Sequence, residues 1–219
     1  MEHSFWHERW ADGRIGFHEG TPNTLLTTHF ATLGMKAGQR VFVPLCGKST
    51  DLIWLRAQGL SVIGAELDRS AVAAFFADNE IQPDVVKTGA HETFSADGIT
   101  LFVGDIFKLS AADIGHIDAV YDRAALVALP DGMRQRYAAH LKTITTCAPQ
   151  LLITFDYDQS LMNGPPFSVP REMVNTLYSK DFSLEELQSR EITGDLTKRG
   201  ARGSEVASLL RPKGPRPAS

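Results

Sequence analysis

Short apolar runs alternate with helix-like stretches along most of this chain. The apolar runs are bounded by Gly, Asp or Pro and have the length of buried strands. They cover Val41–Leu45, Ser61–Leu67, Thr100–Val103, Ala119–Tyr121 and Leu151–Phe155. The helix-like stretches between them cover Asp51–Gln58, Arg69–Asn79 and Gly132 to about Thr146. Because strands and helices alternate, the pattern predicts an α/β three-layer sandwich with a mostly parallel central sheet.

The pattern changes in the last third of the chain. Residues 163–170 form a stiff, proline-dense loop, and Pro170 is well placed at the first position of a helix predicted over residues 171–179. Two further runs, Leu184–Ile192 and Glu205–Leu210, predict an antiparallel hairpin that closes one edge of the sheet.

Neither an internal repeat nor an interdomain linker interrupts the pattern, so one domain over residues 1–211 is expected. Residues 212–219 are rich in Pro and charge, which predicts a disordered tail. Hydrophobic residues make up 43% and charged residues 22% of the 219 residues, as in ordinary globular proteins. A monomer is the expected oligomeric state.

Charge and cysteine usage bear on compartment and partners. A net charge of −4 gives no electrostatic footprint for nucleic acid or a membrane surface. The first ten residues carry charges where a signal peptide would be apolar, and no stretch approaches the roughly 18 apolar residues of a membrane span. Two cysteines, Cys46 and Cys147, cannot form a disulfide framework. We therefore expect a cytoplasmic protein that binds neither nucleic acid nor membrane.

Gly47-Lys48-Ser49 looks like the end of a nucleotide-binding P-loop. That loop requires a glycine five positions before its Gly-Lys, because backbone N–H groups must surround the phosphates. This position is Phe42, and Pro44 in the intended cradle has no N–H to donate. A strand, a tight turn and a helix remain, which suit a small ligand at the strand's carboxyl end. Phosphoryl transfer from ATP remains an alternative function, but the sequence does not supply the backbone N–H donors that it requires.

Cys46, in the same turn, could be a nucleophile or an inert apolar filler. No histidine lies near it in the sequence, which favours the filler.

Glu66 ends the second predicted strand, about 20 residues after the first turn. An acid at this place can accept hydrogen bonds from both ribose hydroxyls of an adenosine-containing ligand. The alternatives are a solvated strand-end carboxylate, or Asp68 in the same role.

Two more residue pairs follow the third and fourth strands and so fall on the same rim of the sheet. Asp105 could form a hydrogen bond with an adenine, and Ile106 could pack against its ring. Arg123 could bind a carboxylate with its planar fork. The alternative is that Asp122 and Arg123 form a surface ion pair of negligible energy.

The N-terminal residues 5–17 are rich in aromatics, and Trp6 and Trp10 lie four apart on one helical face. Core packing is the usual role of such a stripe, but it precedes the first strand, so a lid over the site is the rival interpretation. His3 and His7 have the spacing of a helical metal pair but lack a third ligand nearby, and no metal is expected.

Six segments together resemble the thiopurine S-methyltransferase family in its bacterial form. The likeness covers about residues 4–211, in order. Its segments are residues 5–18, 43–48, 62–66, 105–107, 121–127 and 164–170. The resemblance implies a class I, Rossmann-like methyltransferase fold that uses S-adenosylmethionine, with an N-terminal lid helix at about residues 4–20.

The resemblance also implies roles for individual residues. On the cofactor side, it gives Trp6 and Trp10 as a cover, Leu45 and Gly47 as contacts from the first turn, Glu66 on the ribose, and Asp105 and Ile106 at the adenine. It gives Arg123 a part in binding both, between the methionine end of the cofactor and the acceptor. On the acceptor side, it gives Phe17, Pro165, Pro166 and Phe167 as the pocket lining, and either Arg199 or Arg202 facing the acceptor.

The implied reaction moves the methyl group of S-adenosylmethionine to the sulfur of an aromatic or heterocyclic thiol, with selenium or tellurium compounds as further acceptors. An arginine near the acceptor would favour its thiolate form, so no dedicated base is demanded. Arg123 and Asp158 are the candidates for a direct catalytic part. The alternative in another class is a protein that binds S-adenosylmethionine without catalysis.

Overall fold

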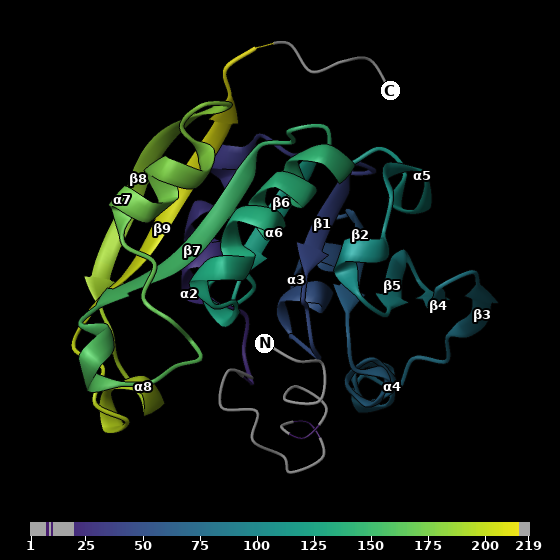
Figure 1. The fold of residues 1–219 in the computed structure, drawn as a ribbon. Helices are drawn as coiled ribbons and strands as arrows, with labels where there is room; N and C mark the ends of the chain where they lie inside the picture. Colours follow the sequence, from purple (N-terminus) through teal and green to yellow (C-terminus); the bar gives the residue numbers. More distant parts are fainter. Residues whose placement is uncertain (1–7, 9, 11–19, 215–219) are drawn as a thin grey trace.

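Nine strands form one mixed sheet in the computed structural model, which describes residues 20–214 together with Glu8 and Trp10 (Figure 1). The strand order within this described part is β3-β4-β5-β2-β1-β6-β7-β9-β8. The strands are β1 (Arg40–Pro44), β2 (Ser61–Glu66), β3 (Asp84–Thr88), β4 (His91–Ala96), β5 (Ile99–Val103), β6 (Ala119–Arg123), β7 (Gln150–Tyr157), β8 (Phe182–Glu191) and β9 (Gly203–Pro212). The central five, from β5 to β7, are parallel, and an antiparallel hairpin flanks them on each side.

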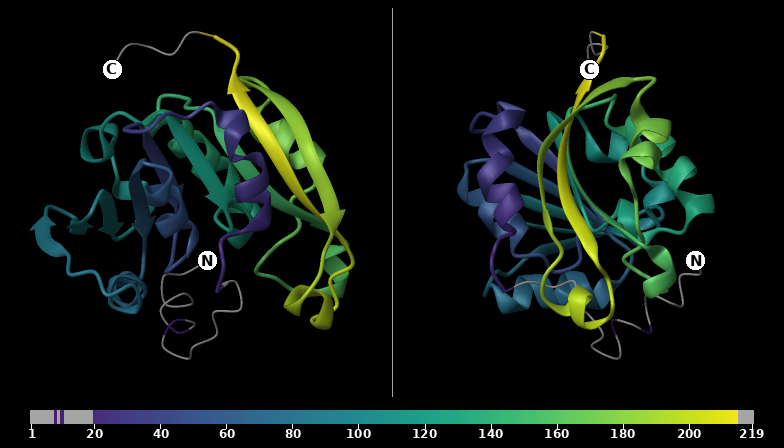
Figure 2. Two further views of the ribbon diagram at one scale, coloured as in Figure 1. Left: turned by 180° about the vertical axis from the view of Figure 1, so that it is seen from behind. Right: turned by 90° about the vertical axis from the view of Figure 1, so that its left-hand side faces the viewer.

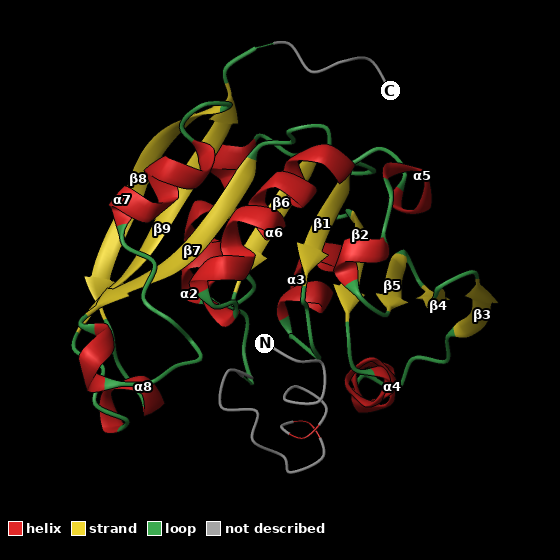
Figure 3. Cartoon of the chain, in the orientation of Figure 1, coloured by secondary structure: helices red, strands yellow, loops and turns green. Residues whose placement is uncertain are grey.

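Helices cover both faces of this sheet, as the edge-on view in Figure 2 shows. One face carries α2 (Thr24–His29), α3 (Asp51–Ala57) and α4 (Arg69–Asp78). The other carries α5 (Ala111–Ile114), α6 (Asp131–Ile144) and α7 (Arg171–Tyr178). The remaining short helices are α8 (Asp195–Lys198) and the 3₁₀ turns η1 (Phe30–Leu33), η2 (Ile106–Lys108), η3 (Leu126–Ala128) and η4 (Gln159–Leu161). Figure 3 shows the resulting three layers, so the predicted α/β sandwich is confirmed.

The alternation of side chains along β1 explains why the sheet is covered twice. Val41 and Val43 are buried in the hydrophobic cluster beneath α2, α3 and α4. Phe42, between them, is buried in the cluster beneath α5, α6 and α7. A strand whose successive side chains are all apolar must bury both faces, and parallel sheets do so with helices. No helix within the described part of the chain has the length and apolarity needed to cross a membrane.

The predicted strands and helices are confirmed, with ends that differ from the prediction by at most two residues. The predicted hairpin is also present: β8 and β9 are antiparallel and close one edge of the sheet. The sequence did not indicate the second hairpin, β3 and β4, because its edge strand carries apolar side chains that face solvent: Val85 is 45% and Val86 58% exposed. The first residues of the expected tail belong to the fold, since Pro212 pairs with Phe182 and the Lys213 N–H donates to the Asp181 carbonyl at 2.9 Å; residues 215–219 lie outside the described part of the chain.

We predict that Gly64→Ala destabilises the fold by roughly 1–3 kcal/mol, the usual cost of overpacking a core. A Cβ at Gly64, within β2, would lie 2.6 Å from Leu101 Cδ2 and 2.8 Å from Cys46 Sγ, and both side chains are buried. The matched control is Gly132→Ala in α6, where a Cβ would have no atom within 4 Å. It should keep or raise the stability, because alanine favours helix. Denaturant unfolding of the two variants measures the difference, and equal stabilities would contradict this packing.

Candidate active site

The carboxyl ends of the parallel strands β1, β2, β5 and β6 meet at one edge of the sheet, where open α/β sheets place their ligands (Figure 1). Two turns at this edge hold non-glycine residues with positive φ: Leu45 after β1 (46°) and Ala124 after β6 (67°). Such backbone is uncommon outside glycine and concentrates at functional sites. Both residues line a hollow of about 30 Å³, together with Val43, Cys46, Lys48, Ser49, Asp51, Tyr121 and Arg123.

Glu66 fastens the first of these turns to the end of β2. Its Oε2 accepts a hydrogen bond from the Gly47 N–H (2.8 Å), and its Oε1 accepts one from the Asp68 N–H (2.9 Å). The side chain is 6% exposed, so the expectation of a solvated carboxylate is wrong. Burial raises the pKa of Glu66, while these backbone hydrogen bonds oppose the rise. The Leu67 N–H also acts on this carboxylate, which has about four acceptor positions and can therefore still accept from a ligand hydroxyl.

Three N–H groups of the same turn, which a phosphate cradle would need free, are bound within the chain. The Cys46 N–H donates to the Ala65 carbonyl (3.0 Å), the Gly47 N–H to Glu66, and the Ser49 N–H to the Cys46 carbonyl (3.2 Å). Lys48 turns away toward α4, where its Nζ pairs with Asp78 at 2.8 Å. A buried carboxylate beside the turn also disfavours an anionic ligand.

Cys46 and Asp68 have local structural roles. Cys46 is 7% exposed, and burial together with the nearby Glu66 raises the pKa of its thiol well above the ordinary value. It is therefore the inert filler that the sequence favoured, because the thiolate is the reactive form. Asp68 caps α4 by accepting a hydrogen bond from the Ser70 N–H (2.8 Å). Its carboxylate is committed to the helix, which leaves Glu66 as the better hydroxyl acceptor.

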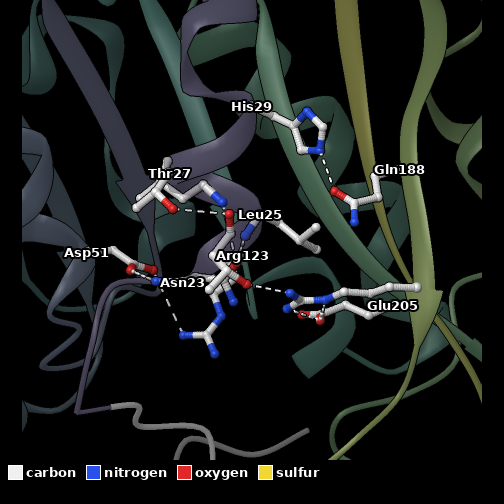
Figure 4. Close-up of polar contacts among 11 residues, drawn as sticks. Asn23, Leu25, Thr27, His29, Asp51, Arg123, Gln188 and Glu205 are labelled. Carbon is white, nitrogen blue, oxygen red and sulfur yellow. Dashed lines mark hydrogen bonds and ion pairs between the residues drawn. The ribbon is translucent and has the colours of Figure 1, made fainter.

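Arg123 and Asp122 point to opposite sides of β6, and they do not form the surface ion pair considered from the sequence. The Arg123 Nη1 lies 3.9 Å from the Oδ2 of Asp51, with the two side chains 13% and 2% exposed (Figure 4). Asp122 is fully buried and accepts hydrogen bonds from the Tyr137 hydroxyl (2.7 Å) and the Leu126 N–H (3.2 Å). Arg123 thus faces the hollow, while Asp122 belongs to the core.

Asp105 and Ile106 follow β5 at the same edge. Asp105 caps the turn η2, since its Oδ1 accepts a hydrogen bond from the Phe107 N–H (3.0 Å). Ile106 is 5% exposed and packs in the core beneath α6. The His140 Nε2 lies 2.8 Å from the Ile106 carbonyl and ties α6 to this turn.

The proline-dense loop at residues 164–167 is held from several sides. The Phe167 N–H donates to the Val127 carbonyl (2.6 Å), and the Tyr157 hydroxyl donates to the Pro166 carbonyl (2.6 Å). The guanidinium of the buried Arg134 lies 5.5 Å from the centre of the Phe167 ring, within cation–π range. These contacts give the loop a defined shape beside the end of β6.

The structure also distinguishes the two C-terminal arginines. The Arg199 Nη2 donates to the Pro165 carbonyl at 3.0 Å, so its guanidinium lies against the proline-dense loop. The Arg202 Nη1 donates to the Thr197 (2.8 Å) and Ala201 (3.0 Å) carbonyls, which keeps it at the end of α8. Of the two, Arg199 lies closer to the loop expected to line the acceptor pocket.

Asp158 is poorly suited to act as a base. It is exposed and accepts hydrogen bonds from the hydroxyl (2.7 Å) and N–H (2.9 Å) of Ser160, which hold the pKa of its carboxyl below the usual range. A carboxylate with a lowered pKa is a weaker proton acceptor.

Of the aromatic residues expected in the N-terminal cover, Trp10 is described, and it is half-buried. Trp6, Phe17, His3 and His7 lie outside the described residues, as does most of the segment expected to form the lid. Among the residues that are described, no group of three or more His, Cys, Asp or Glu side chains could hold a metal ion.

Sequence analysis missed Asp51, Tyr121 and Asn23, which surround Arg123 or its partner. The Asp51 carboxylate accepts hydrogen bonds from the Asn23 N–H (2.7 Å) and the Tyr121 hydroxyl (2.9 Å). An acid in the first turn of a helix is commonplace, and Asn23 reads as an ordinary N-cap of α2. No local pattern could have joined residues 28 and 70 positions apart.

Comparison with known proteins gives one family. The model of the thiopurine S-methyltransferase family matches residues 1–209. The thiopurine S-methyltransferase of Xanthobacter autotrophicus is 52% identical over 197 residues, 90% of this chain and 92% of that protein. The enzyme of the same name from Teredinibacter turnerae is 49% identical over 211 residues, 96% of this chain and 98% of that protein.

Solved structures show the same fold at low identity. The 1,6-didemethyltoxoflavin-N1-methyltransferase of Burkholderia thailandensis, solved with S-adenosylhomocysteine, has a TM-score of 0.65 and 14% identity. The alignment covers 96% of this chain and 87% of that one.

We predict that Asp122→Asn changes how stability depends on pH. Burial raises the pKa of Asp122 to about 6, above the ordinary value of about 3.9. The folded protein therefore holds this proton more tightly than the unfolded chain does. The resulting stabilisation, roughly 3 kcal/mol, is complete below pH 4 and is lost as pH rises through 6.

Asparagine cannot titrate, so the variant should gain stability relative to the native protein between pH 4 and pH 7. Its Oδ1 can still accept from Leu126, and the Tyr137 hydroxyl can turn to accept from the new amide. Urea unfolding at several pH values in this range measures the difference. A constant difference would show that Asp122 is already ionised at the low end of the range.

Proposed function

This chain belongs to the thiopurine S-methyltransferase family, and we propose that it methylates the sulfur of an aromatic or heterocyclic thiol. It is a methyltransferase that uses S-adenosylmethionine. The observation that carries the proposal is that two ionisable side chains of opposite charge lie at the carboxyl ends of strands of one sheet. The buried carboxylate of Glu66 lies at the end of β2, and the Arg123 guanidinium faces the hollow at the end of β6.

The first part of the proposal places the cofactor over β1 and β2. Glu66 would accept hydrogen bonds from the ribose hydroxyls with the lone pairs that Gly47 and Asp68 leave open. Leu45 and Gly47 would contact the ligand from the first turn. Asp105 and Ile106 would border the adenine at the end of β5.

The cover of this site is also part of the proposal. Trp6 and Trp10, with the N-terminal segment around them, would close over the cofactor and exclude water.

The second part places the acceptor beside β6. Phe17, the loop from Pro165 to Phe167 and Arg199 would surround a flat ring, and the contacts of that loop support such a wall. Arg123 would lie between the acceptor sulfur and the cofactor.

The chemistry then requires little beyond alignment. S-adenosylmethionine supplies an activated sulfonium methyl group when bound. Arg123 favours the thiolate over the thiol by its charge and holds it in line. Asp158, with its lowered pKa, would not be needed as a base.

We extend the proposal in three respects. Selenium or tellurium compounds are further acceptors, since the same alignment serves any soft nucleophile. The protein acts as a monomer in the cytoplasm. It takes small molecules and no nucleic acid.

The alternative is a protein that binds S-adenosylmethionine without catalysing transfer. The arginine in the hollow and the well-fixed loop at residues 164–167 favour an enzyme, because a binding protein has no use for an acceptor side. The ATP-dependent alternative is disfavoured, because the N–H groups of Cys46, Gly47 and Ser49 in the first turn are already used within the chain.

We predict turnover of labelled S-adenosylmethionine with a panel of aromatic and heterocyclic thiols, and its loss in Arg123→Lys. Lysine keeps the charge but lacks the planar guanidinium group with its paired N–H donors. The value of kcat/KM should therefore fall while the melting temperature changes little. Methylated thiol is measured by mass spectrometry.

Binding of the cofactor without any methylated product across the panel would support the non-catalytic alternative. A matched fall in kcat/KM and melting temperature would make Arg123 a structural ion-pair partner. Full activity in Arg123→Lys would make it a spectator.

We predict that Glu66→Ala weakens binding of S-adenosylhomocysteine by roughly 1–3 kcal/mol, because it removes charge-assisted hydrogen bonds. Asp68→Ala is the control: it should cost about 1 kcal/mol of stability as a lost helix cap and leave the affinity unchanged. Titration calorimetry gives both affinities. A native affinity in Glu66→Ala would remove Glu66 from the proposed site.

A further inference from the structure

The carboxylate of Asp51 joins three parts of the chain at the proposed site. Asp51 is the first residue of α3 and only 1% exposed. Its Oδ1 accepts a hydrogen bond from the Asn23 N–H (2.7 Å), and its Oδ2 accepts one from the Tyr121 hydroxyl (2.9 Å). The same Oδ2 lies 3.9 Å from the Nη1 of Arg123 (Figure 4).

Because Asp51 is buried, its carboxylate depends on the few groups that surround it. A charge removed from water must be compensated by partners at fixed positions, and Asp51 has them at the N-cap of α2 and on β6. Attraction between Asp51 and Arg123 is also stronger here than at the surface, because little water screens them. Asp51 therefore restricts the positions that the guanidinium of Arg123 can occupy in the hollow that both residues line.

The link to Asn23 extends the restraint toward the N-terminal segment. The Asn23 Oδ1 accepts hydrogen bonds from the Leu25 (2.9 Å) and Leu26 (3.4 Å) N–H groups and caps α2. Its own N–H is the one bound by Asp51, so Asn23 is fixed on both sides. The chain before it is the segment expected to cover the cofactor.

We propose that Asp51 is a positioning residue for methyl transfer, which sets the place of Arg123 and anchors the chain at the base of the N-terminal segment. The inference rests on the proposed part of Arg123 in the reaction. Asp51 acts through Arg123 and Asn23 and has no direct contact with the reacting atoms.

The rival explanation is that Asp51 only holds α2 against the sheet. A second ion pair at the same end of α2, with a buried carboxylate and a partly exposed arginine, allows a comparison. Glu205 on β9 is 8% exposed and accepts two hydrogen bonds from Arg190, through Nε (2.8 Å) and Nη2 (2.6 Å). Arg190 also donates to the Thr24 hydroxyl. Figure 4 shows Glu205 on the side of Asn23 away from Asp51.

The test is a double-mutant cycle on Asp51→Asn and Arg123→Gln, with Glu205→Gln as the control. Asparagine keeps the size of Asp51 and an oxygen for Asn23 but removes the charge. Asp51→Asn should lower kcat/KM about 10- to 100-fold, mostly through kcat, as expected for a displaced positioning group. The double variant should be no slower than Arg123→Gln alone. Glu205→Gln should lower the melting temperature but keep the native kcat.

Each contrary result has a distinct meaning. Effects of Asp51→Asn and Arg123→Gln that multiply would overturn the proposal, because Asp51 would then act independently of Arg123. An equal loss of kcat in Glu205→Gln would show that anchoring α2 is all that matters. Native activity in Arg123→Gln would instead contradict the proposed function of Arg123 itself.

A second variant covers the case in which Asp51→Asn does not fold. Tyr121→Phe leaves the charge of Asp51 in place and removes one of the two partners of its Oδ2. The carboxylate can then turn, so kcat should fall, and the fall should vanish when Arg123→Gln is added. A fall of equal size in both backgrounds would overturn the proposal.

Discussion

The site depends on the carboxylate of Glu66, which holds the first turn of the sheet to the end of β2. Its two oxygens bind the Gly47 and Asp68 N–H groups, so one side chain fixes both the β1 turn and the start of α4. The left-handed backbone at Leu45 is tolerable because these bonds determine the course of the turn. A ligand over this turn therefore meets a surface whose shape is set before it binds.

Buried carboxylates recur along this edge, and each has its own compensation. Glu66 is held by backbone N–H groups, Asp51 by a backbone N–H, a tyrosine hydroxyl and Arg123, and Asp122 by Tyr137 and the backbone. Uncompensated, each would cost several kcal/mol to bury. At Asp122 desolvation outweighs the hydrogen bonds and raises the pKa to about 6. Its neighbour Arg123 avoids that environment because successive side chains of β6 face opposite ways.

Sequence reasoning reached the parallel strands, the β8–β9 hairpin and the rim residues, because buried strands and strand ends leave local signals. It missed the β3–β4 hairpin, where Val85 and Val86 face solvent and form no apolar stripe. It identified Arg123 as a site residue but did not identify the neighbouring residues that fix its position. Tyr121 and Asp51 meet only in three dimensions, and an acid at a helix start has a sufficient local explanation in the helix dipole.

A strand, a turn with Gly-Lys-Ser and a helix would suit a phosphate in another protein, and the difference here is electrostatic. A phosphate site presents unpaired N–H groups, whereas this turn uses the N–H groups of Cys46, Gly47 and Ser49 internally. Glu66 then adds negative charge where a phosphate would lie. The edge consequently favours neutral hydroxyl groups over phosphates, and it tolerates a cationic ligand. S-adenosylmethionine meets both conditions, since it carries ribose hydroxyls, a sulfonium and no phosphate.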